Sequence, residues 1–330
     1  MRTVELGRTG ERVSALALGA MLMGTLTGEE ESFEILDRYT ALGGSFIDTA
    51  NCYAWWPRPG DVGGESESLL GRWFARTGKR DQVFLSTKGS AWVSKPDEAR
   101  GRPDMTPYFE GAGGDTLRQD IDDSLRRLGT DYIDLYYVHV DDYATPLEET
   151  LEALAGIVQA GKARYIGWSN VRTWRLERIR QLAAQHNWPA PVALQQQHSY
   201  LRMKPGVDPV SIVGPEQLDY LRAHDDLTLV AYSPMLKGLY DSAEKRQGHP
   251  VMEMYAGADT EARFAVLDKI AAELGVTPNQ LVLAWLLHQA SPKVIPLIGP
   301  RLLEYYEAAV PALDITLTAD QLAELDSAGV

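Results

Sequence analysis

The chain lacks several features that define whole classes of protein. Cys52 is its one cysteine among 330 residues, so no internal disulfide can form, as is usual in a reducing cytoplasm. No stretch of about 18 apolar residues marks a membrane span, and residues 1–5 carry no apolar run of signal-peptide length. We therefore expect a cytoplasmic protein with no membrane partner.

Basic residues are scarce relative to acidic ones. Lys and Arg number 32 against 46 Asp and Glu, which gives a formal net charge of −14. This charge argues against nucleic acid as a partner, and a phosphate-bearing ligand would need local positive groups and backbone N–H groups. The six histidines lack metal-ligand spacing, so no metal site is expected.

A glycine-rich dinucleotide loop is also missing. The first long strand candidate leads into Leu18-Gly19-Ala20-Met21, which is not the G-x-G-x-x-G loop of a Rossmann fold. Short apolar runs instead alternate with helical patterns, which indicates a parallel sheet, and eight strands favour a closed barrel. The strands are expected at 14–19, 46–48, 83–87, 133–139, 163–168, 192–196, 228–232 and 294–298.

Helical patterns separate these strands. A hairpin over residues 3–13 precedes them, and the helical segment 260–289 is broken near Gly275 and Pro278. The predicted fold is a (β/α)8 TIM barrel with an N-terminal β-hairpin and an extra C-terminal helix, forming one domain over residues 1–330. The helices are expected at 30–42, 65–76, 115–128, 147–160, 173–187, 215–224, 260–289, 301–309 and 318–327.

Four polar residues lie at or just past the ends of three expected strands. Asp48 and Tyr53 follow the second strand, Lys88 closes the third and His139 closes the fourth. Enzymes with this barrel place their chemistry at the C-terminal rim. Strand alternation puts an apolar neighbour below each inward polar group, as a site above a packed interior requires.

Three long loops are expected on the same face of the barrel. They run over 89–114, 198–214 and 237–258. Loops of this length without structure of their own are usually functional lids or disordered segments.

The four residues suit the reduction of a carbonyl group. A free tyrosine has a pKa of about 10, and an ammonium about 4 Å away stabilises the phenolate by up to roughly 4 kcal/mol at an effective dielectric of 20. Lys88 would thus lower the pKa of Tyr53, while Asp48 keeps Lys88 charged and His139 orients the carbonyl oxygen. No side chain supplies a hydride, so a nicotinamide cofactor is implied.

Each residue also has an ordinary structural interpretation. Asp48 and Lys88 could form a structural ion pair, His139 could be a satisfied core histidine, and Tyr53 could be an aromatic near a loop. Their occurrence in order on successive strand ends favours an active site.

Several segments together resemble the aldo-keto reductase superfamily over nearly the whole chain. The resemblance implies Tyr53 as general acid/base, with Asp48, Lys88 and His139 as its supporting set. The matching segments are 44–50 with Tyr53, 86–88, 124–135 leading to His139, 161–170 and 231–234.

The resemblance also implies the cofactor contacts. Tyr232 would stack on the nicotinamide ring, although its ordinary interpretation is packing at the barrel rim. Asn170 could instead cap a helix, Gln195 could equally be a core amide, and Lys237 could be a solvated loop residue. The implied contacts are Ser169, Asn170 and Gln195 at the carboxamide, and Ser233, Met235, Lys237 and Gly238 at the pyrophosphate.

The segment after the last strand departs from the family pattern. Gly299 and Arg301 remain as expected cofactor contacts, and Arg301 could bind a 2′-phosphate or be a surface residue at a helix start. Pro300 removes an N–H donor, and apolar or aromatic residues replace the usual polar partners further on. Because Arg301 remains, NADP(H) is the expected cofactor, with NAD as the alternative. The family pattern is also altered at 54–57 and 140–142, where substrate would enter.

The expected partner is a small-molecule carbonyl or alcohol, and the sequence leaves a homo-oligomer open. Aromatic residues in the substrate loops (Trp55, Trp56, Trp92, Tyr108 and Tyr143) are interspersed with carboxylates (Asp61, Asp97, Asp141 and Asp142). This mixture suits a sugar-like substrate, and a generic aldehyde pocket is the alternative. Two other functions are considered: a regulatory NADPH-binding subunit, and a barrel lyase that forms a Schiff base on Lys88.

Overall fold

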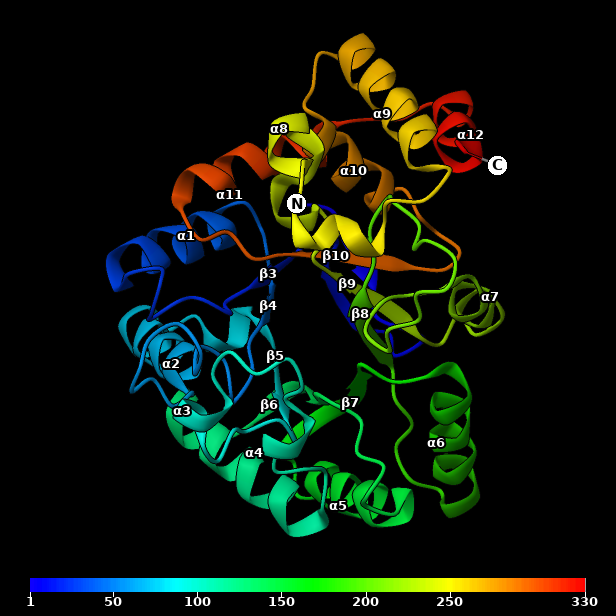
Figure 1. Cartoon of the computed structure of the whole chain (residues 1–330). Helices are drawn as coiled ribbons and strands as arrows, with labels where there is room; N and C mark the ends of the chain where they lie inside the picture. The colour runs from blue at the N-terminus through cyan, green and yellow to red at the C-terminus, as the bar shows by residue number, and fades with distance from the viewer. Residues whose placement is uncertain (330) are drawn as a thin grey trace.

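Eight parallel strands close into a barrel in the computed structural model, which describes residues 1–329 (Figure 1). The strand order around the barrel is β10-β3-β4-β5-β6-β7-β8-β9. The predicted TIM barrel is therefore confirmed. The strands are β3 (Ala17–Gly19), β4 (Phe46–Asp48), β5 (Phe84–Gly89), β6 (Ile133–Val138), β7 (Ala163–Ser169), β8 (Ala193–Gln197), β9 (Thr228–Tyr232) and β10 (Val294–Ile298).

Helices surround the barrel and connect successive strands (Figure 1). The break predicted near Gly275 and Pro278 separates α9 from α10. The longer helices are α1 (Glu29–Ala41), α2 (Glu65–Thr77), α4 (Gly114–Leu128), α5 (Leu147–Gln159), α6 (Thr173–His186), α7 (Pro215–Ala223), α9 (Thr260–Leu274), α10 (Pro278–Leu287), α11 (Leu303–Ala309) and α12 (Ala319–Ser327).

An antiparallel hairpin precedes the barrel. It pairs β1 (Thr3–Glu5) with β2 (Arg12–Ser14). Leu6 and Val13 are fully buried and belong to the same apolar cluster as Phe46 and Phe84, which point into the barrel. The hairpin thus covers apolar side chains of the barrel interior, and burial of such side chains favours this arrangement.

Side-chain alternation along the strands separates the interior from the helix-facing layer. In β5, Phe84 lies in the interior cluster and Leu85 in the outer one. Ser86 and Lys88 share the inward face of Phe84 by the period of two. Lys88 is fully buried. The polar site therefore lies above an apolar interior, as the sequence predicted.

The C-terminal helices are fixed by capping boxes. The Thr277 and Thr318 hydroxyls accept from the backbone N–H groups of Gln280 and Gln321. The two glutamine side chains in turn accept from the backbone N–H groups of the two threonines. Within residues 1–329 no single helix is long and apolar enough to cross a membrane. The pair α9 and α10 passes that test only as a unit bent by 94°.

Two expected loops contain short helices, and several element boundaries differ from the prediction. The segment 89–114 contains α3 (Pro96–Ala99) and η2 (Thr106–Tyr108). The segment 237–258 contains α8 (Ala243–Arg246) and η4 (Pro250–Met254), and it overlaps η3 (Leu236–Asp241). The first barrel strand begins at Ala17 because Ser14 still belongs to the hairpin. Helix α11 begins at Leu303, whose N–H donates to Glu31 Oε1 at 2.9 Å.

Candidate active site

Asp48, Lys88 and Tyr53 form one hydrogen-bonded group at the C-terminal rim of the barrel. Lys88 Nζ donates to Asp48 Oδ2 at 2.6 Å, to the Thr49 carbonyl at 2.7 Å and to the Tyr53 hydroxyl at 2.8 Å. These three acceptors account for all three hydrogens of an ammonium. Strands β4 and β5 are neighbours in the barrel, which explains why residues 40 positions apart in the chain meet here.

The Asp48 carboxylate is held from two further directions. Its Oδ1 accepts from Ser86 Oγ at 2.6 Å and from Gln195 Nε2 at 2.9 Å. Lys88 occupies the other oxygen, so both oxygens of this buried carboxylate are satisfied. These hydrogen bonds fix the carboxylate in position beside the lysine.

The loop that carries Tyr53 is tied to β5 by backbone hydrogen bonds. The Thr49 N–H donates to the Ser86 carbonyl at 2.9 Å, and the Asn51 N–H donates to the Lys88 carbonyl at 3.0 Å. Ala54 then adopts the left-handed region with φ 72°. The Tyr53 N–H donates to the Ala50 carbonyl at 3.3 Å, which closes the turn that carries the tyrosine.

Burial is the largest influence on the pKa values of Tyr53 and Lys88. It raises the pKa of Tyr53 well above its ordinary value, with the Asp48 charge acting in the same direction. Burial also lowers the pKa of Lys88, against the opposing effect of Asp48. The structure thus differs from the predicted lowering of the Tyr53 pKa, because the sequence does not reveal how completely the phenol is enclosed or how close Asp48 lies.

His139 lies against the tyrosine ring from the end of β6. The two ring centroids are 5.5 Å apart at an interplanar angle of 81°. The His139 Nδ1 lies 3.5 Å from Cys52 Sγ. Burial lowers the pKa of His139 well below its ordinary value, and the charge of Lys88 adds to this effect, so the imidazole is neutral.

The residues expected at the carboxamide join the same network. Asn170 Nδ2 donates to the His139 carbonyl at 2.8 Å, and its Oδ1 accepts from the Tyr232 hydroxyl at 2.9 Å. Ser169 Oγ lies 3.0 Å from Asn170 Nδ2. Gln195 is buried and bonded to Asp48, so the structure gives its amide a role in holding the carboxylate.

The loop after β9 has the backbone and the charge to meet an anion. Ser233 and Lys237 are exposed and adopt left-handed φ values of 52° and 62°, and Gly238 follows at 83°. Asn279 anchors this loop, because its N–H donates to Asp241 Oδ1 at 2.7 Å. Such non-glycine strain is retained mainly where function requires it, and Ser233, Met235, Lys237 and Gly238 could line a pyrophosphate.

The residues after β10 lie at a separate part of the rim. Gly299 and Arg301 are both exposed. The Arg301 carbonyl accepts from Thr27 Oγ1 at 2.8 Å, which fixes its backbone and leaves the guanidinium outside. Strand β3 lies between β10 and β4 in the barrel order.

The chain matches the family model described as the aldo/keto reductase family over residues 15–329. It belongs to the aldo/keto reductase family. An uncharacterized oxidoreductase YrpG of Bacillus subtilis is 34% identical over 99% of this chain and 95% of that protein. The aryl-alcohol dehydrogenase GME11368 of Pestalotiopsis microspora and the norsolorinic acid reductase stcV of Emericella nidulans are each 32% identical, over 96% of this chain and 78% of each relative.

A solved aldo-keto reductase has the same fold. The thermostable enzyme Tm1743, crystallised in complex with the inhibitor epalrestat, superposes with a TM-score of 0.72 and 30% identity over 99% of both chains. The aldo/keto reductase barrel is thus shown by sequence and by structure.

The aromatic residues of this aldo/keto reductase divide between three places. Trp55, Trp56 and Tyr108 form one apolar cluster with Tyr53. The Trp56 ring meets the Tyr53 ring edge to face at 6.5 Å between centroids. Trp92 instead lines a cavity beside α4, and Tyr143 pairs with the exposed Trp174.

Most carboxylates of the substrate loops are already engaged. Asp97 pairs with Arg100, whose guanidinium also donates to the carbonyls of Trp55 and Trp56. Asp141 pairs with Arg175 at 2.6 Å, and Asp142 accepts from the Ala112 N–H at 2.9 Å. These contacts hold loops together, whereas Asp61 Oδ2 is buried without a hydrogen-bond partner among residues 1–329.

Two polar residues of the site, Ser86 and Cys52, were not predicted as site residues from the sequence. Ser86 bonds Asp48 directly, and the alternation of β5 already placed it inward. Cys52 lies beside His139, and its position one residue before Tyr53 was the only signal for it. Burial raises the pKa of this thiol to about 12, so it stays protonated.

Proposed function

We propose that the protein reduces a carbonyl group with NADPH, and that Tyr53 donates the proton. The observation that carries this proposal is the lysine that donates to the Tyr53 hydroxyl at 2.8 Å while it is paired with Asp48 at 2.6 Å. Membership of the aldo/keto reductase family supports the carbonyl-reducing chemistry.

The resting site holds the proton on the phenol, because burial and Asp48 both disfavour the phenolate. A bound nicotinamide supplies the hydride. As negative charge develops on the substrate oxygen, Tyr53 transfers its proton to that oxygen. The Lys88 ammonium then stabilises the resulting phenolate by on the order of 6 kcal/mol at an effective dielectric of 20, and burial and Asp48 offset part of this.

His139 would orient the carbonyl oxygen as a neutral donor. Its Nδ1 faces the Cys52 thiol, so we assign Nε2 to the substrate. A neutral imidazole donates a hydrogen bond without adding a second cation beside Lys88. Asn170 holds the backbone of His139 by its bond to the carbonyl oxygen.

For the substrate we propose an aromatic or otherwise flat, apolar carbonyl compound. Trp55, Trp56 and Tyr108 gather with Tyr53, whereas Asp97, Asp141 and Asp142 are engaged in loop contacts. A flat ring gains from aromatic side chains beside the reacting group. This choice replaces the sugar-like substrate considered from the sequence.

For the cofactor we propose NADPH, with Arg301 as the contact to its 2′-phosphate. Arg301 is exposed and has a planar guanidinium suited to phosphate. The Glu31 carboxylate opposes this contact. It accepts a hydrogen bond from the Leu303 N–H, two residues after Arg301, and so places a negative charge near the expected phosphate. The preference over NADH therefore rests on one side chain.

The Schiff-base alternative has no support in the site. Lys88 Nζ donates to three acceptors and is fully buried, which leaves no lone pair free for attack on a carbonyl. The other alternative, a regulatory NADPH-binding subunit, differs from an enzyme in that it would bind the cofactor without turning over a carbonyl compound.

The test is oxidation of NADPH and NADH, followed by absorbance, against a panel of aromatic aldehydes, aromatic ketones and sugars. We expect aromatic carbonyls to turn over fastest with NADPH. Faster turnover of sugars would overturn the substrate proposal. Cofactor binding without turnover of any carbonyl would overturn the enzymatic one.

A further inference from the structure

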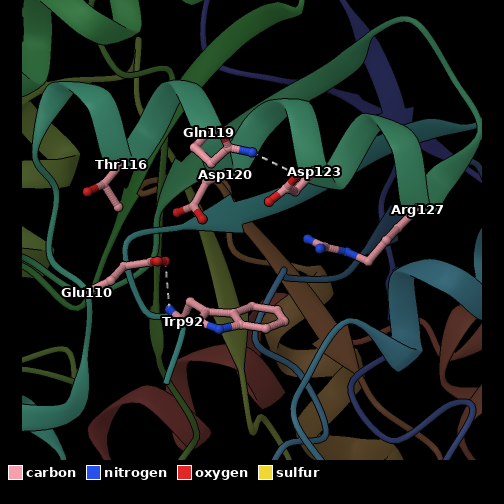
Figure 2. Close-up of a pocket in the computed structure, with 7 residues that line it drawn as sticks. All are labelled: Trp92, Glu110, Thr116, Gln119, Asp120, Asp123 and Arg127. Atoms are coloured by element: carbon pink, nitrogen blue, oxygen red, sulfur yellow. Dashed lines mark hydrogen bonds between the residues drawn. The ribbon is translucent and has the colours of Figure 1, made fainter. Parts of the chain in front are cut away.

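A cavity of about 320 Å³ lies between α4 and the loop after β5. Figure 2 shows Glu110 reaching from the loop toward Asp120 on α4, with Trp92 below them and Arg127 further along the helix. The two carboxyl groups face each other across the cavity (Figure 2). Asp120 is only 6% exposed, so it is no solvated residue of a helix surface.

Each carboxyl group holds backbone on the catalytic side of the barrel. Asp120 Oδ2 accepts from the Ser90 N–H at 2.9 Å. Glu110 Oε1 accepts from the Trp92 N–H at 3.0 Å (Figure 2). It also accepts from Asn51 Nδ2 at 3.5 Å. Ser90 and Asn51 are both buried.

These anchored residues lead directly to the catalytic group. Ser90 follows Lys88 by two residues, and its hydroxyl accepts from the His139 N–H at 3.2 Å. Asn51 precedes Tyr53 by two residues, and its N–H donates to the Lys88 carbonyl at 3.0 Å. The two carboxyl groups thus support the segments of Tyr53, Lys88 and His139 from behind.

Arg127 lines the same cavity and its charge partly offsets the effect of burial on the pKa of Glu110, but Arg127 forms its ion pair elsewhere. Arg127 of α4 pairs with Glu67 of α2 at 2.7 Å, and its guanidinium lies over the Trp92 ring at 5.4 Å from the centroid. Within residues 1–329 neither Glu110 nor Asp120 forms an ion pair. The other titratable groups facing the pair are Glu67, Asp123, the Cys52 thiol and the Tyr136 hydroxyl.

Two neighbouring carboxylates without an ion-pair partner repel each other, and one proton between them removes the repulsion. Burial raises the pKa of Asp120 to about 8, and the charge of Glu110 adds to this. Burial also raises the pKa of Glu110. Glu110 and Asp120 both line the cavity, which offers a shared proton a route to solvent.

We propose that Glu110 and Asp120 are a proton-sharing pair of positioning residues that holds the Tyr53, Lys88 and His139 segments in their reactive arrangement. Loss of the shared proton to solvent forces the carboxylates apart. The Ser90 and Asn51 anchors then loosen, and the catalytic residues lose their alignment. The catalytic consequence rests on the proposed reductase function, whereas the loosening of the loop does not.

The experiment compares the full-length wild type with Asp120→Asn, Asp120→Ala and Asp123→Asn. Asparagine keeps an acceptor for the Ser90 N–H and a donor to Glu110, and it cannot lose a proton near pH 8. Alanine removes the acceptor. Asp123 lines the same cavity without contacting Ser90 or Asn51, which makes its variant the matched control.

The first measurement is amide hydrogen exchange of the segment 89–93, compared between variants at the same pH. At pH 7 we expect the wild type and Asp120→Asn to be equally protected and Asp120→Ala to exchange faster. At pH 9 we expect the wild type to lose protection while Asp120→Asn keeps it. This readout needs no turnover, so it separates failure of this proposal from failure of the reductase assignment.

The second measurement is the pH profile of kcat/KM. For the wild type and Asp123→Asn we expect a loss of about tenfold from pH 7 to pH 9, as one ionisation near pH 8 produces. Asp120→Asn should remove this alkaline loss. Asp120→Ala should be slow at both pH values, and its rescue by asparagine marks the missing hydrogen bond as the cause.

The proposal is overturned if Asp120→Asn shows the same alkaline loss of exchange protection as the wild type. It is also overturned if Asp120→Ala keeps full protection at pH 7.

Discussion

The two halves of the barrel rim differ in how much their polar residues are already bonded. At the ends of β4, β5 and β6, Asp48 and Lys88 are buried, and Lys88 has three hydrogen-bond acceptors. After β9 and β10, Lys237 and Arg301 are exposed. Hydrogen bonds within the protein fix the side chains of the first half, whereas the second half presents positive charge at the surface. Changes in the first half should therefore alter the chemical step, and changes in the second should alter cofactor affinity.

The largest effect is expected for Lys88→Met. It removes the cation beside Tyr53 and leaves the buried Asp48 carboxylate without its counter-ion. General acid catalysis contributes about 10²–10⁴-fold, so kcat should fall by at least about 10³-fold while NADPH still binds. Rapid-mixing measurement of the hydride-transfer rate checks this, and a change confined to KM would contradict it.

A smaller effect on the same half is expected for Ser86→Ala. It removes one hydrogen bond to the Asp48 carboxylate and leaves that of Gln195 in place. A hydrogen bond to a charged group is worth about 1.5–3 kcal/mol, so kcat should fall by about tenfold to a hundredfold. Ser68→Ala, at a half-buried helix serine that bonds only its own helix, is the control and should match the wild type.

Features that neighbouring residues determine can be predicted from the sequence, whereas contacts between distant segments cannot. The strand ends at Asp48, Lys88 and His139 follow from local patterns and alternation, and the structure brings them together. The engagement of Asp141 by Arg175 and the pairing of Glu110 with Asp120 depend on how loops fold back onto helices. Such long-range contacts have no periodic signal in the chain.

The protonation of Tyr53 shows the same limit. A neighbouring lysine predicts a lowered pKa, but the outcome depends on how fully the phenol is buried and on Asp48. Both are properties of the closed barrel rather than of any segment.

On the exposed half we expect Arg301→Ala to weaken NADPH binding by about tenfold, which corresponds to about 1.4 kcal/mol. The affinity for NADH and kcat with saturating NADPH should stay unchanged, because the exposed Arg301 side chain would contact only the 2′-phosphate, which NADH lacks. Titration of protein fluorescence with each cofactor measures this. Equal loss for both cofactors would show that Arg301 does not read the 2′-phosphate.

The smallest effect concerns stability and pH. The Asp120 carboxyl has a pKa raised to about 8 in the folded protein, whereas an unfolded aspartate titrates near about 4. The folded state therefore binds the proton more tightly, and the wild type loses stability as pH rises from about 4 to about 8. Asp120→Asn lacks this loss.

The melting temperature of Asp120→Asn relative to the wild type should thus rise by a few degrees from pH 5 to pH 9. Calorimetric melting of both proteins at the two pH values measures the difference. Asp123→Asn should show no such trend, and a constant gap for Asp120→Asn would contradict the raised pKa.

The most direct test of the account is single-turnover reduction of an aromatic aldehyde by Tyr53→Phe with NADPH bound beforehand. This change removes the hydroxyl that accepts from Lys88 at 2.8 Å and leaves the ring in place. We predict unchanged NADPH affinity and a hydride-transfer rate reduced by about 10²–10⁴-fold. A rate within about twofold of the wild type would show that the proton comes from another group.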